Sequence, residues 1–355
     1  MKKALKIILI LLLVLVLLVA AYVAYVFLTY YRIEDHQTLT VTSAAAVAAA
    51  EKDRPYKLVS WNIGFGAYED DYGFFMDGGT QSWAWSPERL TANLDRIGAL
   101  LAEQNADFLL VQEVDTSSTR TYHVDEYDLL REALAPYDSV FAQNYDSPFL
   151  MYPLTQPHGA NKSGIGTFSK IAVTSAERRS LPIETGMTKL VDLDRCYSVS
   201  RIPVSGGGEL VLYDLHLSAY TTDGTIATEQ LKMLLADMQA EYEAGNWCVA
   251  GGDFNKSLVD DPSAFGVTEG EYTWGQAIPP ETFDGVDIVK VPPFDEKNPV
   301  PSCRNADGPY HAGQYVVTVD GFFVSPNVAV SNADVLDTQF RYSDHNPVAM
   351  IFTLQ

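Results

Sequence analysis

The sequence predicts an α/β (α+β) fold, a four-layer sandwich of two mixed β-sheets flanked by helices and preceded by one N-terminal transmembrane helix. Short apolar runs that end in polar or glycine turns recur through most of the 355 residues and are typical of buried strands. Amphipathic segments lie between them in a mixed order, which fits two sheets packed face to face with helices outside. An uncharged apolar run precedes all of these elements.

The N-terminal run is long enough for a membrane anchor. Lys2, Lys3 and Lys6 precede an uncharged stretch, residues 7–28, and about 20 apolar residues cross a bilayer. Lysines on this side favour an N-terminus inside the cell membrane and a C-terminal domain outside. A cleaved signal peptide is the alternative, with small residues at 19–21, but signal cores are usually only about 7–15 residues long. Both interpretations export the rest of the chain, and we favour the uncleaved anchor.

The sequence divides into three parts. Residues 1–31 are the expected anchor or signal peptide, and residues 32–54, with an alanine-rich middle, are expected to form a stalk or linker outside the domain. Residues 55–355 are expected to form one domain, in which the loop-rich stretch 260–309 is not a separate unit.

The elements of this domain follow from turn signals and periodicity. Ser86-Pro87 is a good N-cap and first turn for a helix with Leu90, Leu94 and Ile97 on one face. Further helices are predicted over 124–134 and 226–242. Strands are predicted at 56–63, 107–114, 164–170, 171–175, 196–204, 210–217, 247–250, 315–325, 328–336 and 347–353.

Composition excludes some classes of protein. The formal net charge of −22 disfavours a dedicated nucleic-acid-binding protein, because such binding depends on Lys and Arg. Cys196, Cys248 and Cys303 are far apart and predict neither a zinc site nor a disulfide framework. Each is expected to pack as a small apolar residue.

Polar side chains stand at the ends of several apolar runs. In Gly251-Gly252-Asp253-Phe254-Asn255, a strand ends in a glycine turn with a carboxylate and an amide at its tip, although a simple Asx turn would also fit. An acid within an apolar strand is costly to bury unless it is paired. The other members of this polar set are Asn62, Glu113, His216, Asp320, Asp344 and His345.

Each of these residues has a less specific interpretation. Asn62 fits a turn amide, Glu113 a cap, His216 a satisfied core histidine, Asp344 an Asx turn, and Asp320 a buried ion-pair partner. Together, however, they suit one reaction, the metal-assisted hydrolysis of a phosphoester. Carboxylates and amides bind Mg²⁺, an acid or a histidine–acid pair activates water, and amide and imidazole donors stabilise phosphate charge.

The motifs that carry these residues resemble the endonuclease/exonuclease/phosphatase family, which includes deoxyribonuclease-like enzymes, neutral sphingomyelinases and inositol polyphosphate 5-phosphatases. They occur in the family's order from residue 56 to the C-terminus. The motifs are Ser-Trp-Asn62-Ile, Val-Gln-Glu113-Val, Asp-Leu-His216-Leu, Gly-Gly-Asp253-Phe-Asn255 and Ser-Asp344-His345-Asn-Pro-Val.

The resemblance implies a catalytic domain that uses Mg²⁺, with Mn²⁺ as a substitute. It implies that Glu113 is the principal metal ligand, that Asn62 helps to hold the metal site, and that Asp344 lies beside the metal or at a second metal site. Arg195 resembles an arginine that begins a central strand in relatives and is expected to contact the substrate phosphate.

The resemblance also implies roles in proton transfer and phosphate binding. Asp253 is expected to orient or activate the attacking water, and Asn255 to contact the phosphate. His216 is expected to contact the phosphate or to protonate the leaving group. His345 is expected to contact the phosphate and to be oriented by Asp320.

One departure from the family pattern concerns substrate fit. Relatives often have an aromatic residue directly after the acid matched to Asp320, whereas this chain has Gly321, which is expected to loosen the wall beside His345. His123 and His158 lie in loops and receive no role. Trp83, Trp85, Phe74 and Phe75 are expected to pack over the core, with lipid contact as the alternative.

Three functions therefore remain open from the sequence. The first is a membrane-anchored, extracytoplasmic phosphodiesterase or phosphatase, acting on a lipid headgroup or another small phosphoester. An extracellular nuclease acting on nucleic acid is the second, and a non-catalytic binding module on the same scaffold is the third. The membrane is expected to be reached through the N-terminal helix, and no protein partner is implied.

Overall fold

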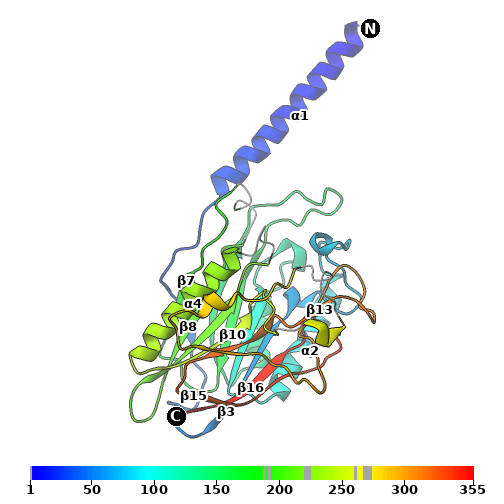
Figure 1. Ribbon diagram of the computed structural model, residues 1–355. Helices are drawn as coiled ribbons and strands as arrows, with labels where there is room; N and C mark the ends of the chain where they lie inside the picture. The colour runs from blue at the N-terminus through cyan, green and yellow to red at the C-terminus, as the bar shows by residue number, and fades with distance from the viewer. Residues whose placement is uncertain (1, 187–188, 190–192, 220–224, 260–261, 267–273) are drawn as a thin grey trace.

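The computed structural model describes residues 2–186, 189, 193–219, 225–259, 262–266 and 274–355 (Figure 1). In this part of the chain, the strands form two seven-stranded sheets and one two-stranded ribbon. Sheet A has the order β1 (Gln37–Thr38), β7 (Ser175–Ser180), β8 (Cys196–Pro203), β9 (Glu209–His216), β10 (Trp247–Asp253), β14 (Asp320–Val324) and β11 (Val289–Val291). Sheet B has the order β15 (Val328–Val335), β16 (Val348–Leu354), β3 (Pro55–Asn62), β4 (Phe108–Asp115), β6 (Lys162–Ser169), β5 (Asp138–Asp146) and β2 (Val41–Thr42).

Both sheets are mixed. The pairs β3–β4 and β9–β10 are parallel, and the remaining pairs within the two sheets are antiparallel. The ribbon consists of β12 (Cys303–Arg304) and β13 (Val316–Val317). Short 3-10 helices lie in the loops at η1 (Gly64–Gly66), η2 (Phe75–Asp77), η3 (Thr119–Thr121), η5 (Pro262–Phe265) and η6 (Pro280–Phe283).

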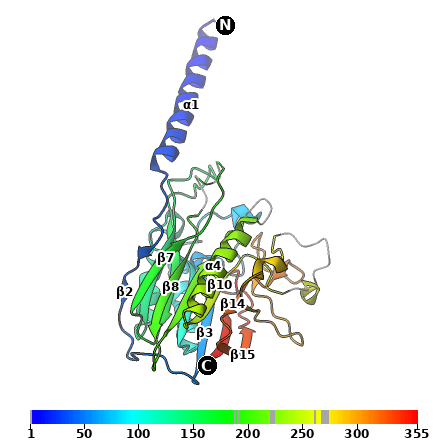
Figure 2. The same cartoon turned by 60° about the vertical axis from the view of Figure 1, so that its left-hand side comes forward.

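The two sheets pack face to face, with helices on their outer faces. Leu58 and Leu110 of sheet B share a buried core with Leu212 and Phe322 of sheet A. The helices α2 (Pro87–Glu103) and α3 (Glu126–Ala133) pack on sheet B, while α4 (Thr225–Glu243) lies across sheet A (Figure 2). The predicted four-layer sandwich is therefore confirmed.

The start of α2 follows the predicted capping chemistry. The Ser86 side chain accepts a hydrogen bond from the Arg89 amide at 3.2 Å, with Pro87 in the first turn, so α2 begins where expected. The Asp125 side chain caps α3 by accepting from the Asp128 amide at 3.0 Å.

The predicted strands differ from the structure in several respects. The expected strand at 171–175 is absent, and Ile171 makes only an isolated bridge to Val47, while β7 begins at Ser175. The strands β5 and β7 were not predicted, because polar residues interrupt their apolar pattern. The expected strand 315–325 is split into β13 and β14, because the backbone at Thr318 and Val319 bonds to the loop after β10 instead of continuing a sheet.

The expected stalk is instead part of the sandwich. β1 pairs with β7 at one edge of sheet A, and β2 pairs with β5 at one edge of sheet B. Ala50 is buried and its amide donates to the Pro203 carbonyl at 2.8 Å. The segment pairs with backbone groups at the sheet edges that would otherwise bond to water. Two-residue strands of this kind are too short to leave a pattern in the sequence.

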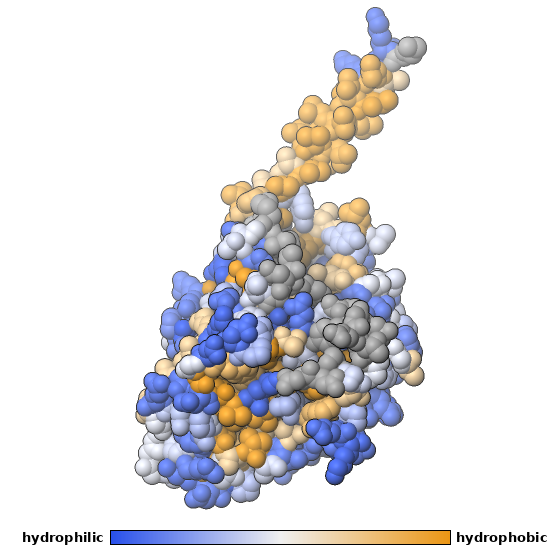
Figure 3. Space-filling model, in the orientation of Figure 1, coloured by the Kyte–Doolittle hydropathy of each residue, from blue (hydrophilic) through white to orange (hydrophobic). Residues whose placement is uncertain are grey.

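The helix α1 (Lys2–Thr29) projects from the body of the molecule (Figure 1). Beyond its basic N-terminal tip, the helix is apolar along its length in Figure 3, whereas the visible face of the domain mixes hydrophilic and hydrophobic residues. Among the described residues, it is the one helix long and apolar enough to cross a membrane.

Candidate active site

Six strand ends meet at one end of the sandwich. The carboxyl ends of β3, β4, β9 and β10 lie together: β3–β4 and β9–β10 are parallel pairs, and Asn62 at the end of β3 bonds to Asp253 at the end of β10. β14 and β16 run in the opposite direction, so their amino ends arrive at the same place: Asp320 pairs with Asp253, and Val348 pairs with Ser60. The polar residues at these strand ends therefore form one cluster.

A pocket of about 380 Å³ opens at this cluster. Seven of the nine predicted site residues line it, namely Glu113, Arg195, His216, Asp253, Asn255, Asp344 and His345. Asn62 and Asp320 lie just behind this lining and bond to its members. The structure thus brings all nine residues together.

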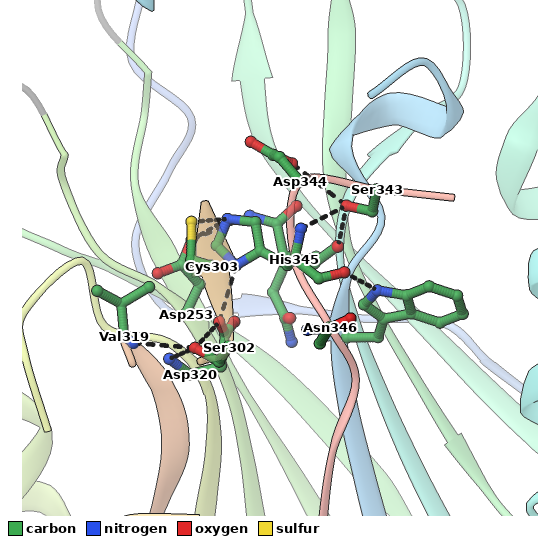
Figure 4. A network of polar contacts seen from close by, with 12 residues as sticks. Asp253, Ser302, Cys303, Val319, Asp320, Ser343, Asp344, His345 and Asn346 are labelled. Atoms are coloured by element: carbon green, nitrogen blue, oxygen red, sulfur yellow. Dashed lines mark hydrogen bonds and ion pairs between the residues drawn. The ribbon is translucent and has the colours of Figure 1, made fainter. Parts of the chain in front are cut away.

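His345 and Asp320 form a buried pair at the pocket floor. The Asp320 Oδ2 atom lies 2.8 Å from His345 Nδ1 and also accepts the Ser302 hydroxyl at 2.7 Å (Figure 4). Burial alone lowers the pKa of His345, but Asp320 and the neighbouring acids raise it well above its ordinary value. The opposite ring nitrogen, Nε2, lies 3.8 Å from Asp253 Oδ2.

Asn62 joins the two sheets at the site. Its Nδ2 donates to Asp253 Oδ2 at 2.9 Å and to Glu113 Oε1 at 3.3 Å, while its Oδ1 accepts from the Gly64 amide at 3.0 Å. Burial raises the pKa of Asp253 to about 6, against the opposing effect of His345. One amide group thus fixes two carboxylates.

Glu113 owes its orientation to a bulge in β4. The register with β6 shifts between Val111 and Val114, and Glu113 has a φ of 54°, which is uncommon for a residue with a side chain. Its carboxylate Oε1 lies 3.9 Å from His216 Nε2. The bulge therefore aims a partly exposed carboxylate into a site whose other acids are mostly buried.

Asp344 is held by the turn before β16. Ser343 Oγ donates to the Asn62 carbonyl at 2.8 Å and contacts Asp344 Oδ1 at 3.2 Å. Burial raises the pKa of Asp344 to about 7; His345 opposes this effect and the like charge of Glu113 adds to it. The two carboxylates thus repel each other, and a cation between them would relieve this repulsion.

Arg195 and His216 line the same pocket and carry buried nitrogen atoms without partners in the described part of the chain. Arg195 is buried, and its Nε and Nη1 atoms have no hydrogen-bond partner within the described ranges. His216 Nδ1 also lacks a partner there, and burial, followed by Arg195 and His345, lowers the pKa of His216 well below its ordinary value. Buried polar atoms without partners are uncommon, and the Arg195 guanidinium adds a positive charge beside the pocket that suits an anion.

Asn255 lies on the loop after β10, with a positive φ of 49°. Its amide N–H donates to Asp253 Oδ1 at 2.9 Å, and its side-chain Nδ2 donates to the Leu217 carbonyl at 2.8 Å. The second Nδ2 hydrogen can still reach a ligand.

Sequence reasoning missed other pocket residues because they come from loops without a periodic pattern. Cys303, expected only to pack as an apolar residue, has its Sγ 3.4 Å from His345 Nε2, and burial raises the pKa of its thiol to about 12. An isolated bridge between Cys303 and His345 brings the β12 strand against the site. The other missed lining residues include Tyr68, Asp77, Trp274 and Arg304.

The expectation for Gly321 is wrong. A Cβ atom built on Gly321 would lie 2.4 Å from Leu258 Cδ1 and 3.0 Å from Pro293 Cδ. Because these two side chains already fill the space, the missing aromatic residue leaves no gap in the wall. A side chain at position 321 would require Leu258 to shift.

The loop aromatic residues mostly pack over the core, as predicted. Phe74 is buried, and Trp83 Nε1 donates to the Pro157 carbonyl at 2.7 Å. Trp85 remains 40% exposed. His158 is buried away from the pocket lining, with its Nδ1 3.2 Å from the Ser82 carbonyl.

Comparison with known proteins agrees with this architecture. The sequence model of the Endonuclease/Exonuclease/phosphatase family matches residues 59–345. An endonuclease/exonuclease/phosphatase from Beutenbergia cavernae is 18% identical, with a TM-score of 0.61 over 85% of this chain and 72% of that one. A counterpart from Bacteroides vulgatus is 16% identical, with a TM-score of 0.54 over 85% of this chain and 100% of that one.

A third similar structure is ANGEL2, a 2′,3′-cyclic phosphatase in complex with adenosine-2′,3′-vanadate. It is 16% identical, with a TM-score of 0.55 over 84% of this chain and 96% of that one. Likeness at these identities shows the fold alone. A comparison with curated proteins finds no match.

Proposed function

Because this chain belongs to the endonuclease/exonuclease/phosphatase family, we propose that it is a phosphoester hydrolase that uses a divalent cation, Mg²⁺ or its substitute Mn²⁺. The observation that supports this proposal is the convergence of carboxylates and unpaired donors on one pocket. Glu113, Asp253 and His345 come from three distant parts of the sequence and line the same 380 Å³ space.

The carboxylates of Glu113 and Asp344 would hold the cation. Their oxygens suit Mg²⁺, and their mutual repulsion, expressed in the raised pKa of Asp344, is the kind of charge excess that a cation relieves. Asn62 supports Glu113 through its side-chain amide. When bound, the cation would neutralise phosphate charge and assist departure of the leaving oxygen.

Asp253 is the residue best placed to accept a proton from water. Its pKa of about 6 leaves it ionised at neutral pH while keeping it close to the working range of a general base. Asn62 and the Asn255 amide hold its two oxygens, which fixes its direction. A positioned base of this kind contributes a rate factor of roughly 10²–10⁴.

Positively charged and neutral donors would bind the phosphoryl oxygens. Protonated His345, fixed by Asp320, offers Nε2 to the pocket, and Arg195 offers two unpaired N–H groups. His216 is kept neutral by burial, so it can donate from one nitrogen without adding charge. Asn255 adds a further amide donor, and these groups stabilise the charge that builds on the phosphoryl group.

We further propose that α1 anchors the chain in the cell membrane, with the N-terminus inside and residues 55–355 outside. The uncharged helix after three lysines supports this topology. A phosphoester in a lipid headgroup is the favoured substrate class, because anchoring concentrates the pocket at the bilayer. The net charge of −22 disfavours tight binding of nucleic acid.

The test uses the full chain in detergent micelles. Hydrolysis of bis-p-nitrophenyl phosphate, a phospholipid panel and plasmid DNA would be measured with Mg²⁺, with Mn²⁺ and with chelator. We expect activity that chelation abolishes and that favours phospholipid. Plasmid hydrolysis comparable to phospholipid hydrolysis would instead favour the nuclease, and activity insensitive both to chelation and to Glu113→Ala would overturn the proposal.

A further inference from the structure

The loop between β5 and β6 has no role in the proposed chemistry. No charged residue occurs between Asp146 and Lys162, in a chain in which charged residues make up 20%. Several of its large apolar side chains are exposed: Phe149 by 38%, Met151 by 45%, Tyr152 by 69% and Leu154 by 82%. We call residues 149–154 the apolar loop. An exposed apolar group of this kind marks a contact surface.

The apolar loop touches α1 within its apolar run. The Phe149 amide donates to Tyr25 Oη at 3.1 Å, and the Met151 amide donates to Tyr22 Oη at 3.1 Å. Tyr22 Oη in turn donates to the Phe149 carbonyl at 3.2 Å. The loop therefore lies beside the last turns of α1 and at the base of the projecting helix (Figures 1 and 2).

These contacts fix the depth of the loop if α1 crosses a bilayer. The uncharged run continues to Leu28, so Tyr22 lies about 9 Å before its end at 1.5 Å per residue. Tyrosines at this position are typical of the membrane–water interface. The apolar loop must then reach the same interface, since it is bonded to them.

Backbone groups of the loop are also hydrogen-bonded, as the membrane interface requires. Backbone groups in a low-dielectric layer must be paired, and the tyrosine hydroxyls pair three of them. Leu150 and Gly159 exchange two backbone hydrogen bonds, at 2.9 and 3.0 Å, which closes the loop on itself. The exposed side chains that remain are aromatic or aliphatic.

The apolar loop is linked to the pocket. β5 runs parallel to β4, since both are antiparallel to β6, so the loop leaves the sandwich at the end where Glu113 lies. The Tyr152 ring packs on Phe75, with centroids 5.7 Å apart, and Ser82 Oγ donates to the Gln156 carbonyl at 2.7 Å. Phe75 precedes Met76 and Asp77, which line the pocket.

We propose that the apolar loop is a second membrane-contact surface, which inserts Phe149, Met151, Tyr152 and Leu154 into the outer interface of the bilayer beside α1. It holds the pocket end of the domain at the lipid surface. The inference rests on the proposed anchoring by α1 but not on the proposed catalytic activity. Because the loop has no charge and the chain is acidic, the surface that it fits is a zwitterionic one.

The test places single fluorescent probes on the full chain in phosphatidylcholine vesicles. Cys196, Cys248 and Cys303 are buried, so an introduced cysteine can be labelled selectively. The variants are Leu154→Cys in the apolar loop, Leu13→Cys in α1, and Ser205→Cys in the exposed β8–β9 turn at the opposite end of the sandwich. Quenching by nitroxide-labelled phosphatidylcholine reports contact with lipid.

We expect the probes at positions 154 and 13 to be quenched several-fold more than the probe at position 205. A loop probe quenched no more than the Ser205→Cys control, beside a quenched α1 probe, would overturn the inference while the anchor stands. Absence of quenching at position 13 would remove the anchor and the inference together. Neither outcome depends on whether the protein hydrolyses a phosphoester.

Discussion

The Asp320 carboxylate lies 2.8 Å from Nδ1 of His345, and the Ser302 hydroxyl holds the same carboxylate oxygen at 2.7 Å. This pair joins the amino ends of β14 and β16, which belong to different sheets. The position of the His345 ring therefore depends on how the two sheets pack. Its outward nitrogen faces the pocket only while Asp320 accepts from the inward one.

Replacement of Asp320 should impair His345 without unfolding the protein. Asp320→Asn keeps the shape of the side chain but removes the charge, so we expect kcat to fall by roughly 10²-fold or more and the pKa of His345 to drop. Steady-state kinetics on a soluble phosphoester and imidazole NMR would measure the two effects. Asp95→Asn, exposed on α2, is the matched control and should change neither. An unchanged His345 pKa in Asp320→Asn would contradict this explanation.

Replacement of Glu113 should weaken the cation site. Glu113→Gln removes the charge of the proposed oxygen ligand, and loss of even a supporting residue typically lowers metal affinity by ~10–100-fold. We expect a loss at least that large in Mn²⁺ binding, measured by electron paramagnetic resonance, with a parallel rise in the Mg²⁺ concentration needed for activity. Glu103→Gln at the exposed end of α2 serves as the control. Equal Mn²⁺ affinity in both variants would exclude Glu113 as a ligand.

The buried pair Arg120–Asp115 should support the loop that follows the Glu113 bulge. Arg120 donates to Asp115 through Nε at 2.9 Å and Nη2 at 2.8 Å, and its guanidinium lies 3.7 Å from the centre of the Phe65 ring. Arg120→Met leaves Asp115 buried without its cation, so we expect the free energy of unfolding to fall by about 3–5 kcal/mol. Chemical denaturation would measure this loss.

The double variant Arg120→Met/Asp115→Leu tests the cause. Because it removes the stranded charge as well, we expect it to be more stable than Arg120→Met alone. A double variant as unstable as the single one would show that packing, rather than charge, sets the effect.

Stability should fall in mild acid because of His158. Burial, followed by the Arg120 charge, lowers the pKa of this histidine to about 4, whereas an unfolded histidine titrates near 6.5. Between these values the unfolded chain binds a proton that the folded chain does not. The His158 contribution to stability is therefore complete above about pH 6.5 and is lost progressively as the pH falls toward 4, by about 1 kcal/mol per pH unit.

Melting temperatures between pH 7.5 and 4.5 would measure this dependence. His158→Asn should flatten the profile relative to the wild type, while His311→Asn, in an exposed loop, should leave it unchanged. Parallel profiles for His158→Asn and the wild type would assign the acid sensitivity to other groups.

The parts of this structure that the sequence predicts are those in which local pattern and tertiary role agree. Asn62, His216 and Asp253 each end a buried strand, so an apolar run followed by a polar residue marked them. The bulge that aims Glu113 into the pocket is invisible in the sequence, because its φ is set by the pairing of β4 with β6. Only its residue type and the surrounding motif led to its predicted role.

The features that the sequence did not predict share a physical cause. Residues 37–42 were expected in a stalk because two-residue strands carry no periodicity, and only the free edges of the sheets gave them partners. Cys303 was expected only to pack as a small apolar residue. Its sequence neighbours do not indicate that the short strand β12 brings its sulfur to His345. In both cases distant chain segments, rather than local preference, determined the conformation.

If α1 crosses a bilayer, the short connection after it limits how far the pocket can lie from the membrane surface. Only residues 30–36 separate Thr29 from β1, which is at most about 25 Å of fully extended chain. Even this length is not free, because Arg32 Nε is bonded to Asp194 at 2.9 Å and Tyr31 to Asp146. Molecules that diffuse in the plane of the same leaflet would meet the pocket repeatedly, whereas those in the surrounding fluid would reach it only by chance encounter.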